Sequence, residues 1–200
     1  IGRARPAVQA RAKIGFRRDG RILAMDLFTV GDGGPYGRSG DHMSLANIAS
    51  LAYQPESVRV RGVGVYTNTP PRAAQRAPGG EQAISMLAPL MDKAARQLGL
   101  DRTEIIRVNA PEGQARFGAP GRDGRQSNVS SAFVREALDR GKDAFGWSER
   151  SRRSGQLSGS KATGVGVALS TFSAGSVGMD ALMVLRPDGR LQIQTGVGNL

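Results

Sequence analysis

The 200-residue chain contains no cysteine and a single histidine, His42. The absence of cysteine excludes disulfides, iron–sulfur ligation and most zinc sites within this sequence. One histidine cannot build a multi-histidine metal centre. Aromatic residues make up only 5% of the chain, and no run approaches the roughly 18 apolar residues of a membrane-spanning helix. Any metal that this protein uses must therefore be held by something other than its side chains.

The net charge of +11 at pH 7 raises the possibility of nucleic-acid binding, because Lys/Arg-rich surfaces gain affinity by releasing counterions from phosphates. The distribution of charge argues against it. Basic residues cluster at 3–21 and 150–153, with few accompanying aromatics and no helix-turn-helix or RNA-stacking motif. We expect these arginines to face acidic surface elsewhere in a larger protein. A basic nucleic-acid-binding module is the alternative.

Both ends of the sequence lack the features of natural termini. Ile1 is not a start methionine, and "LQIQTGVGNL" stops in a glycine-rich turn. We expect an internal segment of a longer polypeptide. The N-terminus has no signal-peptide pattern, which favours the cytoplasm, with the periplasm as the alternative.

Hydrophobic periodicity predicts an α+β fold, with mixed β-hairpins and sheets packed against two or three helices. Residues 7–30 read as a hairpin that turns at Asp19-Gly20, and residues 57–68 alternate like a half-buried strand. Apolar residues at steps of three and four predict a helix over 82–98, ended by Gly99.

The remaining segments are read from weaker patterns. A second helix is predicted over 129–145, and strands over 163–172 and 179–195. The last region repeats the Asp-Gly-Arg turn of the first hairpin. A weak internal duplication or chance would explain this repeat. His42 lies in the polar stretch "SGDHMS", which predicts a solvated loop histidine.

The stretch "TNTPPRAAQRAPGGEQA", residues 67–83, is the most constrained part of the sequence. It follows a predicted strand, contains three prolines and the pair Gly79-Gly80, and carries Arg76 just before a helix begins. Read alone, it is an ordinary strand–turn–helix connection with a surface arginine.

In its wider context, this stretch resembles the molybdenum-binding large subunit of the xanthine dehydrogenase/aldehyde oxidase family. In that family a strand leads into Thr-Asn, a small–aromatic–Arg–Gly–x–Gly–Gly–Pro–Gln loop, a helix and an Arg-x-x-Asn turn. The hairpin segment "RPAVQARAKIGFRRDGRILAMDLFTVGDGGPYG" is similar to the family as well. Matching residues of the later motifs are Thr67, Asn68, Ala74, Arg76, Gly79, Gly80, Gln82, Arg107 and Asn109.

The resemblance implies a cofactor-binding loop made by Gln75, Arg76, Ala77, Gly79 and Gly80. An arginine supplies a planar cation at any working pH, and glycines let main-chain N–H groups approach an anionic cofactor. No residue of the segment is implied as a direct metal ligand.

A substrate pocket is implied around Ser44, Pro78 and Phe172. Ser44 stands where xanthine oxidases carry a purine-orienting arginine, and Pro78 replaces a phenylalanine that sandwiches the ring. Ala77 stands where carbon monoxide dehydrogenases carry a copper-holding cysteine. The implied substrate is therefore an aldehyde or an N-heteroaromatic compound, hydroxylated with water-derived oxygen. The general-base glutamate of the family lies downstream of this segment, so we expect no activity from the segment alone.

The resemblance also implies the surroundings of the chain. Residues 1–145 would form the central part of a first molybdenum-cofactor-binding domain, residues 146–160 a linker, and residues 161–200 the start of a second such domain. The cofactor would be a molybdenum-pyranopterin, with or without a cytosine dinucleotide. An iron–sulfur subunit would carry 2Fe–2S clusters, and a flavin (FAD) or cytochrome (haem) subunit would accept electrons. A catalytically inactive structural homologue is the further alternative.

Overall fold

The first part of the chain builds a three-stranded sheet in a computed structural model that describes residues 4–36, 40–171 and 181–195. β1 (Val8–Phe16) and β2 (Ile22–Asp32) form the antiparallel hairpin predicted from the sequence. β3 (Ser57–Val65) pairs with the other edge of β2 and runs parallel to it. The predicted hairpin is confirmed, and the strand predicted over residues 57–68 is confirmed over 57–65.

A helix connects the two parallel strands. Parallel neighbours need a connection that returns across the sheet, and it is made by the short 3-10 helix η1 (Gly34–Tyr36) and by α1 (Asp41–Ala52). The prediction of a solvated loop around His42 is wrong, because this residue lies in the first turn of α1 and is half-buried. Leu45, Ile48 and Ala52 have the spacing of one helical face, which was the available sequence signal.

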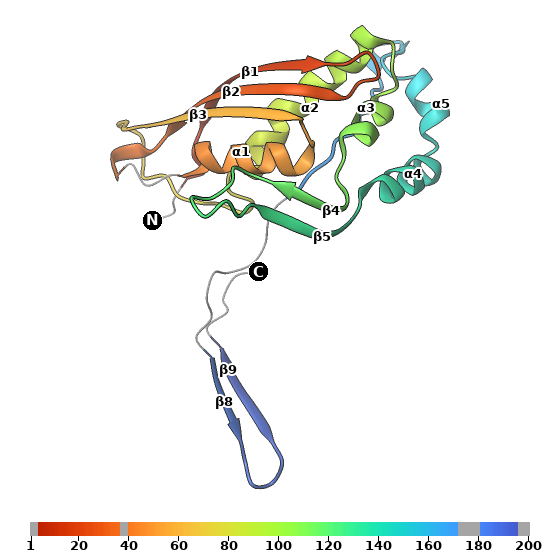
Figure 1. The fold of residues 1–200 in the computed structure, drawn as a ribbon. Coiled ribbons are helices and arrows are strands. Elements are labelled where there is room, and N and C mark those ends of the chain that lie inside the picture. The colour runs from red at the N-terminus through yellow and green to blue at the C-terminus, as the bar shows by residue number, and fades with distance from the viewer. Residues whose placement is uncertain (1–3, 37–39, 172–180, 196–200) are drawn as a thin grey trace.

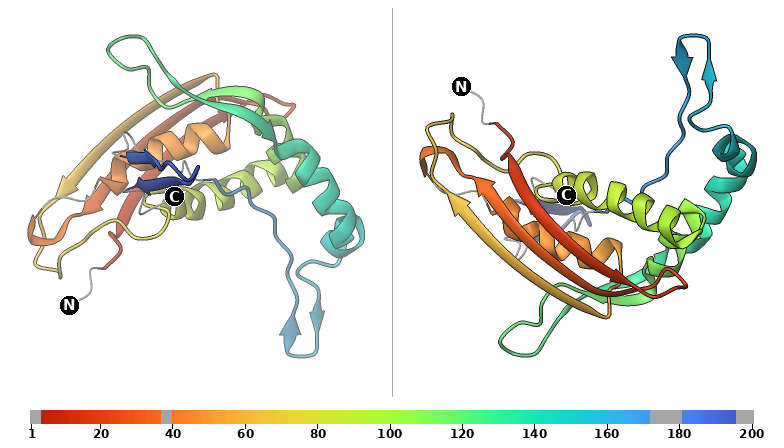
Figure 2. Two further views of the ribbon diagram at one scale, coloured as in Figure 1. Left: turned by 90° about the horizontal axis from the view of Figure 1, so that it is seen from below. Right: turned by 90° about the horizontal axis from the view of Figure 1, so that it is seen from above.

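The long helix α2 (Gly80–Leu98) follows the predicted pattern and ends at Gly99, whose positive φ of 69° allows the left-handed C-cap. α1 and α2 lie side by side on the same face of the sheet (Figure 1), and Figure 2 shows both helices from below. Between them and the sheet lies the core. It comprises Ile22, Met25, Leu27, Leu45, Ile48, Ala49, Ala52, Tyr53, Ala83, Leu87, Met91, Ala94, Ala95, Ile105 and Ile106.

A second group of elements flanks this body. It contains α3 (Arg102–Asn109), the hairpin of β4 (Glu112–Phe117) and β5 (Ser127–Phe133), α4 (Val134–Phe145) and α5 (Trp147–Arg152). The helix predicted from residue 129 begins only at Val134, because the preceding residues pair with β4 as a strand.

The C-terminal part contains two small hairpins. β6 (Leu157–Ser158) pairs with β7 (Lys161–Ala162), and β8 (Ala181–Leu185) pairs with β9 (Leu191–Thr195). The last hairpin is the one predicted at Asp188-Gly189, and it projects away from the body (Figure 1). The strand predicted over 163–172 is absent over 163–171, and residue 172 lies outside the described residues.

The α+β class is confirmed: small mixed sheets combine with five α-helices in the described part of the chain. None of the described helices has both the length and the apolar character needed to cross a membrane.

Asn109, the last residue of α3, ties this helix to the first hairpin. Its side chain is 1% exposed. The Oδ1 atom accepts a hydrogen bond from the Ile22 N–H at 2.8 Å, and Nδ2 donates to the carbonyls of Gly20 and Ile105, each at 2.8 Å. One amide therefore satisfies three buried main-chain groups from two elements.

Replacing Asn109 by alanine should lower the free energy of unfolding by about 1–3 kcal/mol, because buried main-chain groups lose their partners. Urea denaturation of the purified protein measures this loss. Asn128→Ala, at an exposed position of β5, is the control and should change stability little. Equal stability of the two variants would contradict the role assigned to Asn109.

Candidate functional site

The candidate site lies where the parallel strands β2 and β3 end. Asp32 and Val65 are register partners at the carboxyl ends of these strands, and the predicted loop starts two residues after Val65. Ligands of sheets with parallel strands bind preferentially beyond the carboxyl ends of the strands. The topology thus places residues 67–83 at an edge suited to binding.

The Asp32 carboxylate fixes the beginning of this loop. It accepts hydrogen bonds from the hydroxyls of Thr67 and Thr69, the latter at 3.1 Å, and from the Gly34 N–H at 3.0 Å. Arg72 pairs with it at 2.8 Å. The Thr67 hydroxyl, followed by Gly34, Thr69 and Arg72, lowers the pKa of Asp32 to about 2. Sequence reasoning missed this carboxylate, because its side-chain partners Thr67, Thr69 and Arg72 are more than thirty positions away.

The segment before β1 holds the middle of the loop. Residues 4–6 run beside it, with an isolated parallel bridge to Arg72. Arg5 donates from Nη2 to the carbonyl oxygen of Arg76 at 2.7 Å. The Gln82 side chain, at the far end of the loop, donates to the main chain of this segment at 3.2 Å. The loop is therefore held at its start, middle and end.

Two residues of the loop have left-handed backbone conformations. Ala77 has φ of 56°, which is uncommon for a residue with a Cβ, and Gly79 has φ of 75°. Within the described part of the chain, the main-chain N–H groups of Ala77 and Gly79 have no hydrogen-bond acceptor. Pro78 between them has no N–H, so these are two separate main-chain donors, each free to bind an anion. Strained backbone of this kind concentrates at functional sites.

The start of α2 adds positive potential. Gly79 is its N-cap and supplies no side-chain cap. The N–H groups of Gly80 and Glu81 donate to the carbonyl oxygen of Ala77, at 3.0 and 3.4 Å, so the start of α2 contributes mainly the positive end of the helix dipole, directed toward the loop. Arg76 is exposed, and no carboxylate among the described residues pairs with its guanidinium. Gln75 and Ala77 are half-buried on either side, and Gly80 is buried.

Two buried polar atoms beside the loop lack partners in the described structure, namely Arg5 Nη1 and Gln82 Oε1. Buried polar groups are rarely left without a hydrogen bond. Arg5 Nη1 adds a donor to the main-chain N–H groups and the Arg76 guanidinium, whereas Gln82 Oε1 is an acceptor that can take a hydrogen bond from a hydroxyl or amine. The donors around the loop suit a polyoxygenated anionic group. The residues present therefore fit such a cofactor.

The structure brings one predicted substrate-pocket residue next to the predicted cofactor loop. A methyl group on Gly79 would come within 2.7 Å of Ser44 Cβ, so the loop lies directly against α1. Pro78 is half-buried in the same loop. Phe172 lies outside the described residues. Ser44 also lines a cavity of about 360 Å³ with no charged side chain, bounded by α1, β3 and Gly118.

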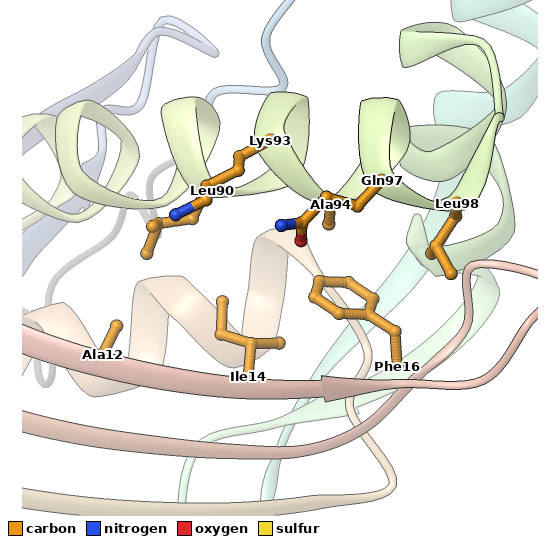
Figure 3. Close-up of a pocket in the computed structure, with 8 residues that line it drawn as sticks. All are labelled: Ala12, Ile14, Phe16, Leu90, Lys93, Ala94, Gln97 and Leu98. Atoms are coloured by element: carbon orange, nitrogen blue, oxygen red, sulfur yellow. The ribbon is translucent and has the colours of Figure 1, made fainter.

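A separate cavity of about 210 Å³ lies between β1 and α2, away from the loop. Figure 3 shows Ile14 and Phe16 of β1 facing Leu90 and Leu98 of α2, with Lys93 and Gln97 near them. Most of the lining is aliphatic or aromatic, and none of the residues predicted for the site takes part in it. This cavity is a gap at the sheet edge rather than part of the site.

The main-chain donors of Ala77 and Gly79, the start of α2 and the Arg76 guanidinium make this loop a candidate anion-binding site at a sheet edge. Residues 1–110 match the family model of the molybdopterin cofactor-binding domain. The match covers more than half of the chain, which therefore belongs to this family. The resemblance seen in the sequence is confirmed, and a nucleic-acid-binding role finds no support.

Named relatives agree with this assignment. The chain is 28% identical over 97% of its length to the putative xanthine dehydrogenase molybdenum-binding subunit XdhA of Escherichia coli (strain K12). It is also 28% identical over 94% of its length to the aldehyde oxidoreductase of Megalodesulfovibrio gigas. It spans only 26% and 20% of these two proteins.

Solved structures are similar too. The aldehyde oxidoreductase from Desulfovibrio gigas superposes with a TM-score of 0.73 at 26% identity, covering 94% of this chain and 21% of that one. Quinoline 2-oxidoreductase from Pseudomonas putida 86 gives a TM-score of 0.56 at 25% identity, covering 72% of this chain and 19% of that one.

The acid sensitivity of the site should follow the lowered pKa of Asp32. Because this pKa lies near 2 in the folded state, against 3.8 ordinarily, the unfolded chain takes up the proton first. The stability contributed by ionised Asp32 is complete above pH 4 and is lost as the pH falls toward 2. Unfolding measured between pH 2 and 5 should therefore show a difference between the wild type and Asp32→Asn that shrinks on acidification.

Thr67→Val tests the cause of the shift. Loss of the Thr67 hydroxyl should move the Asp32 transition to higher pH, since this hydrogen bond lowers the pKa most. Parallel stability curves for the wild type and Asp32→Asn over this range would contradict the assignment.

Proposed function

We propose that residues 75–80 bind the molybdenum-pyranopterin cofactor in the large subunit of a molybdenum hydroxylase. The observation that carries the proposal is the donor-rich loop of Arg76, Ala77 and Gly79 at the carboxyl edge of β2 and β3. Membership of the molybdopterin cofactor-binding family supports it. When bound, the cofactor supplies the redox centre for hydroxylation with water-derived oxygen.

Each residue of the loop would have a distinct task. Arg76 would donate charge-assisted hydrogen bonds to an anionic oxygen of the cofactor, in a planar geometry that lysine cannot reproduce. The N–H groups of Ala77 and Gly79 would add main-chain donors. Gln75 would place an amide where the family commonly has an aromatic ring, and Gly80 would let the start of α2 approach closely.

The fixed loop would contribute preorganisation. Donors that already point at the cofactor need not reorganise during the reaction, which is the main source of electrostatic stabilisation in enzymes. The hydrogen bonds of Asp32 and Arg5 to the loop serve this purpose. The general base is proposed to lie outside these 200 residues, so the chain alone would be inactive.

An aldehyde or an N-heteroaromatic compound is the proposed substrate class. Ser44 and Pro78 replace the charged and aromatic purine contacts expected in a xanthine oxidase, and the cavity beside Ser44 has no charged lining. Relatives named for aldehyde, quinoline and nicotinate chemistry occur beside those named for xanthine. The relatives' names alone therefore leave the substrate undecided.

The remaining parts of the enzyme are proposed from the same family membership. Iron–sulfur clusters of the 2Fe–2S type would lie on a partner subunit, since this chain has no cysteine, and an FAD- or haem-carrying subunit would take the electrons. The pterin is proposed with or without a cytosine dinucleotide. Residues 1–145 would belong to the first cofactor-binding domain, 146–160 to a linker and 161–200 to the second domain. The cytoplasm is the proposed compartment, with the periplasm as the alternative.

Arg76→Ala in the assembled enzyme should lower turnover by roughly 10²–10³, the usual effect of removing one preorganised charge-stabilising donor. Arg76→Lys should recover only part of it, because the planar fork is missing. Steady-state assays and molybdenum content per subunit measure the effect. Arg125→Ala, at a side chain that is 90% exposed, is the matched control. Wild-type turnover and metal content in Arg76→Ala would refute the cofactor role.

Xanthine and hypoxanthine should be poor substrates. A substrate whose polar group lacks its protein partner is turned over orders of magnitude less efficiently. Ser44 cannot supply the charged partner that a purine would need. Values of kcat/KM for both purines, beside aromatic aldehydes and N-heterocycles, decide the matter. Xanthine oxidation as efficient as that of the best alternative substrate would overturn the proposed substrate class.

A further inference from the structure

The imidazole of His42 lies in a recess made by three glycines of the sheet. Gly31 of β2 and Gly64 of β3 are register partners, and Gly62 is two residues before Gly64 on the same face. A methyl group on Gly31 would come within 3.0 Å of His42 Nδ1, one on Gly62 within 2.8 Å of Cδ2, and one on Gly64 within 3.1 Å of Cε1. Any side chain at these positions would therefore push the imidazole, and the helix that carries it, away from the sheet.

The opposite side of the same helical turn carries the cofactor loop. A methyl group on Gly79 would lie 2.8 Å from the carbonyl oxygen of Asp41 and 3.0 Å from the main-chain nitrogen of Leu45. The Asp41 carboxylate also accepts a hydrogen bond from Gln82 at 3.2 Å. The first turn of α1 is thus in contact with the sheet on one side and with the loop on the other.

The fit of His42 depends on shape rather than on hydrogen bonding by the ring. Its Nδ1 is buried and has no partner in the described structure. The main chain is fixed separately, because the hydroxyl of Thr29 donates to the carbonyl oxygen of His42 at 2.9 Å. Thr29 is fully buried. A flat ring of similar size should therefore fill the recess as well as imidazole does.

We propose that His42 is a positioning residue whose ring sets the distance between the sheet and the cofactor loop. It acts through the first turn of α1, on which Gly79 rests, and it touches neither cofactor nor substrate. This inference rests on the proposed function only in taking residues 75–80 as the cofactor loop. The spacing itself can be tested without the cofactor.

Hydrogen–deuterium exchange of residues 74–83 in the assembled enzyme is the primary measurement, with molybdenum content per subunit as the second. In His42→Ala the loop should exchange at least roughly tenfold faster, because local opening becomes easier when its support is lost. Exchange in the core strand β2 should stay close to wild type. His42→Asn, which keeps a flat group no larger than imidazole, should exchange more slowly than His42→Ala. Wild-type loop exchange in His42→Ala would overturn the proposal.

A double-mutant cycle isolates the contact between residue 64 and His42 even where single variants lose stability. Gly64 is the best probe, because the three atoms nearest to a methyl group there all belong to His42. Gly64→Ala should speed loop exchange in the wild type and have little effect in the His42→Ala background, since the clash is gone. Gly15→Ala in β1 is the matched control, because a methyl group there meets nothing within 4 Å. An equal effect of Gly64→Ala in both backgrounds would refute the spacer role.

The two measurements separate this inference from the proposed function. Faster loop exchange with an unchanged molybdenum content would support the spacer role of His42 and contradict cofactor binding by the loop. A joint loss of loop protection and molybdenum would support both.

Discussion

The parallel pairing of β2 with β3 is the constraint on which the rest of the structure depends. Two parallel neighbours cannot be joined by a tight turn, so the chain must return across the sheet. The return is α1, which covers the inner face beside α2. The same pairing brings the carboxyl ends of both strands to one edge. The position of the loop, its supporting helix and its anchoring carboxylate all follow from this choice of strand direction.

Glycines allow the sheet, the first turn of α1 and the loop to pack closely. The recess beneath His42 and the contact at Gly79 are places where the main chain and the first turn of α1 approach within van der Waals distance. Larger residues would separate the layers, so the glycines of β2 and β3 have a packing role that their weak strand propensity would not suggest. The sheet, the first turn of α1 and the loop are in direct contact, so the position of the loop is fixed by its neighbours.

Ion pairs within the chain account for some of its many arginines. On the outer face of the sheet, Asp26 pairs with Arg59 at 2.6 Å and with Arg61 at 3.6 Å, and the Arg61 guanidinium lies 5.6 Å from the ring centre of Phe28. These exposed pairs contribute little to stability. At the loop, by contrast, Arg72 and Asp32 are mostly shielded from solvent, and their pairing orders the main chain that would hold the cofactor.

The sequence by itself determined the hairpin at Asp19-Gly20, the helix ended by Gly99 and the turn at Asp188-Gly189, because these depend on local periodicity and on glycine conformations. The order of motifs around Arg76 also identified the family. Only the tertiary structure decided that Asp32 anchors the loop and that His42 is packed against the sheet rather than solvated. Each of these depends on partners distant in the chain, brought together by the parallel strand pairing, and a pattern read along the sequence contains no information on which strands become neighbours.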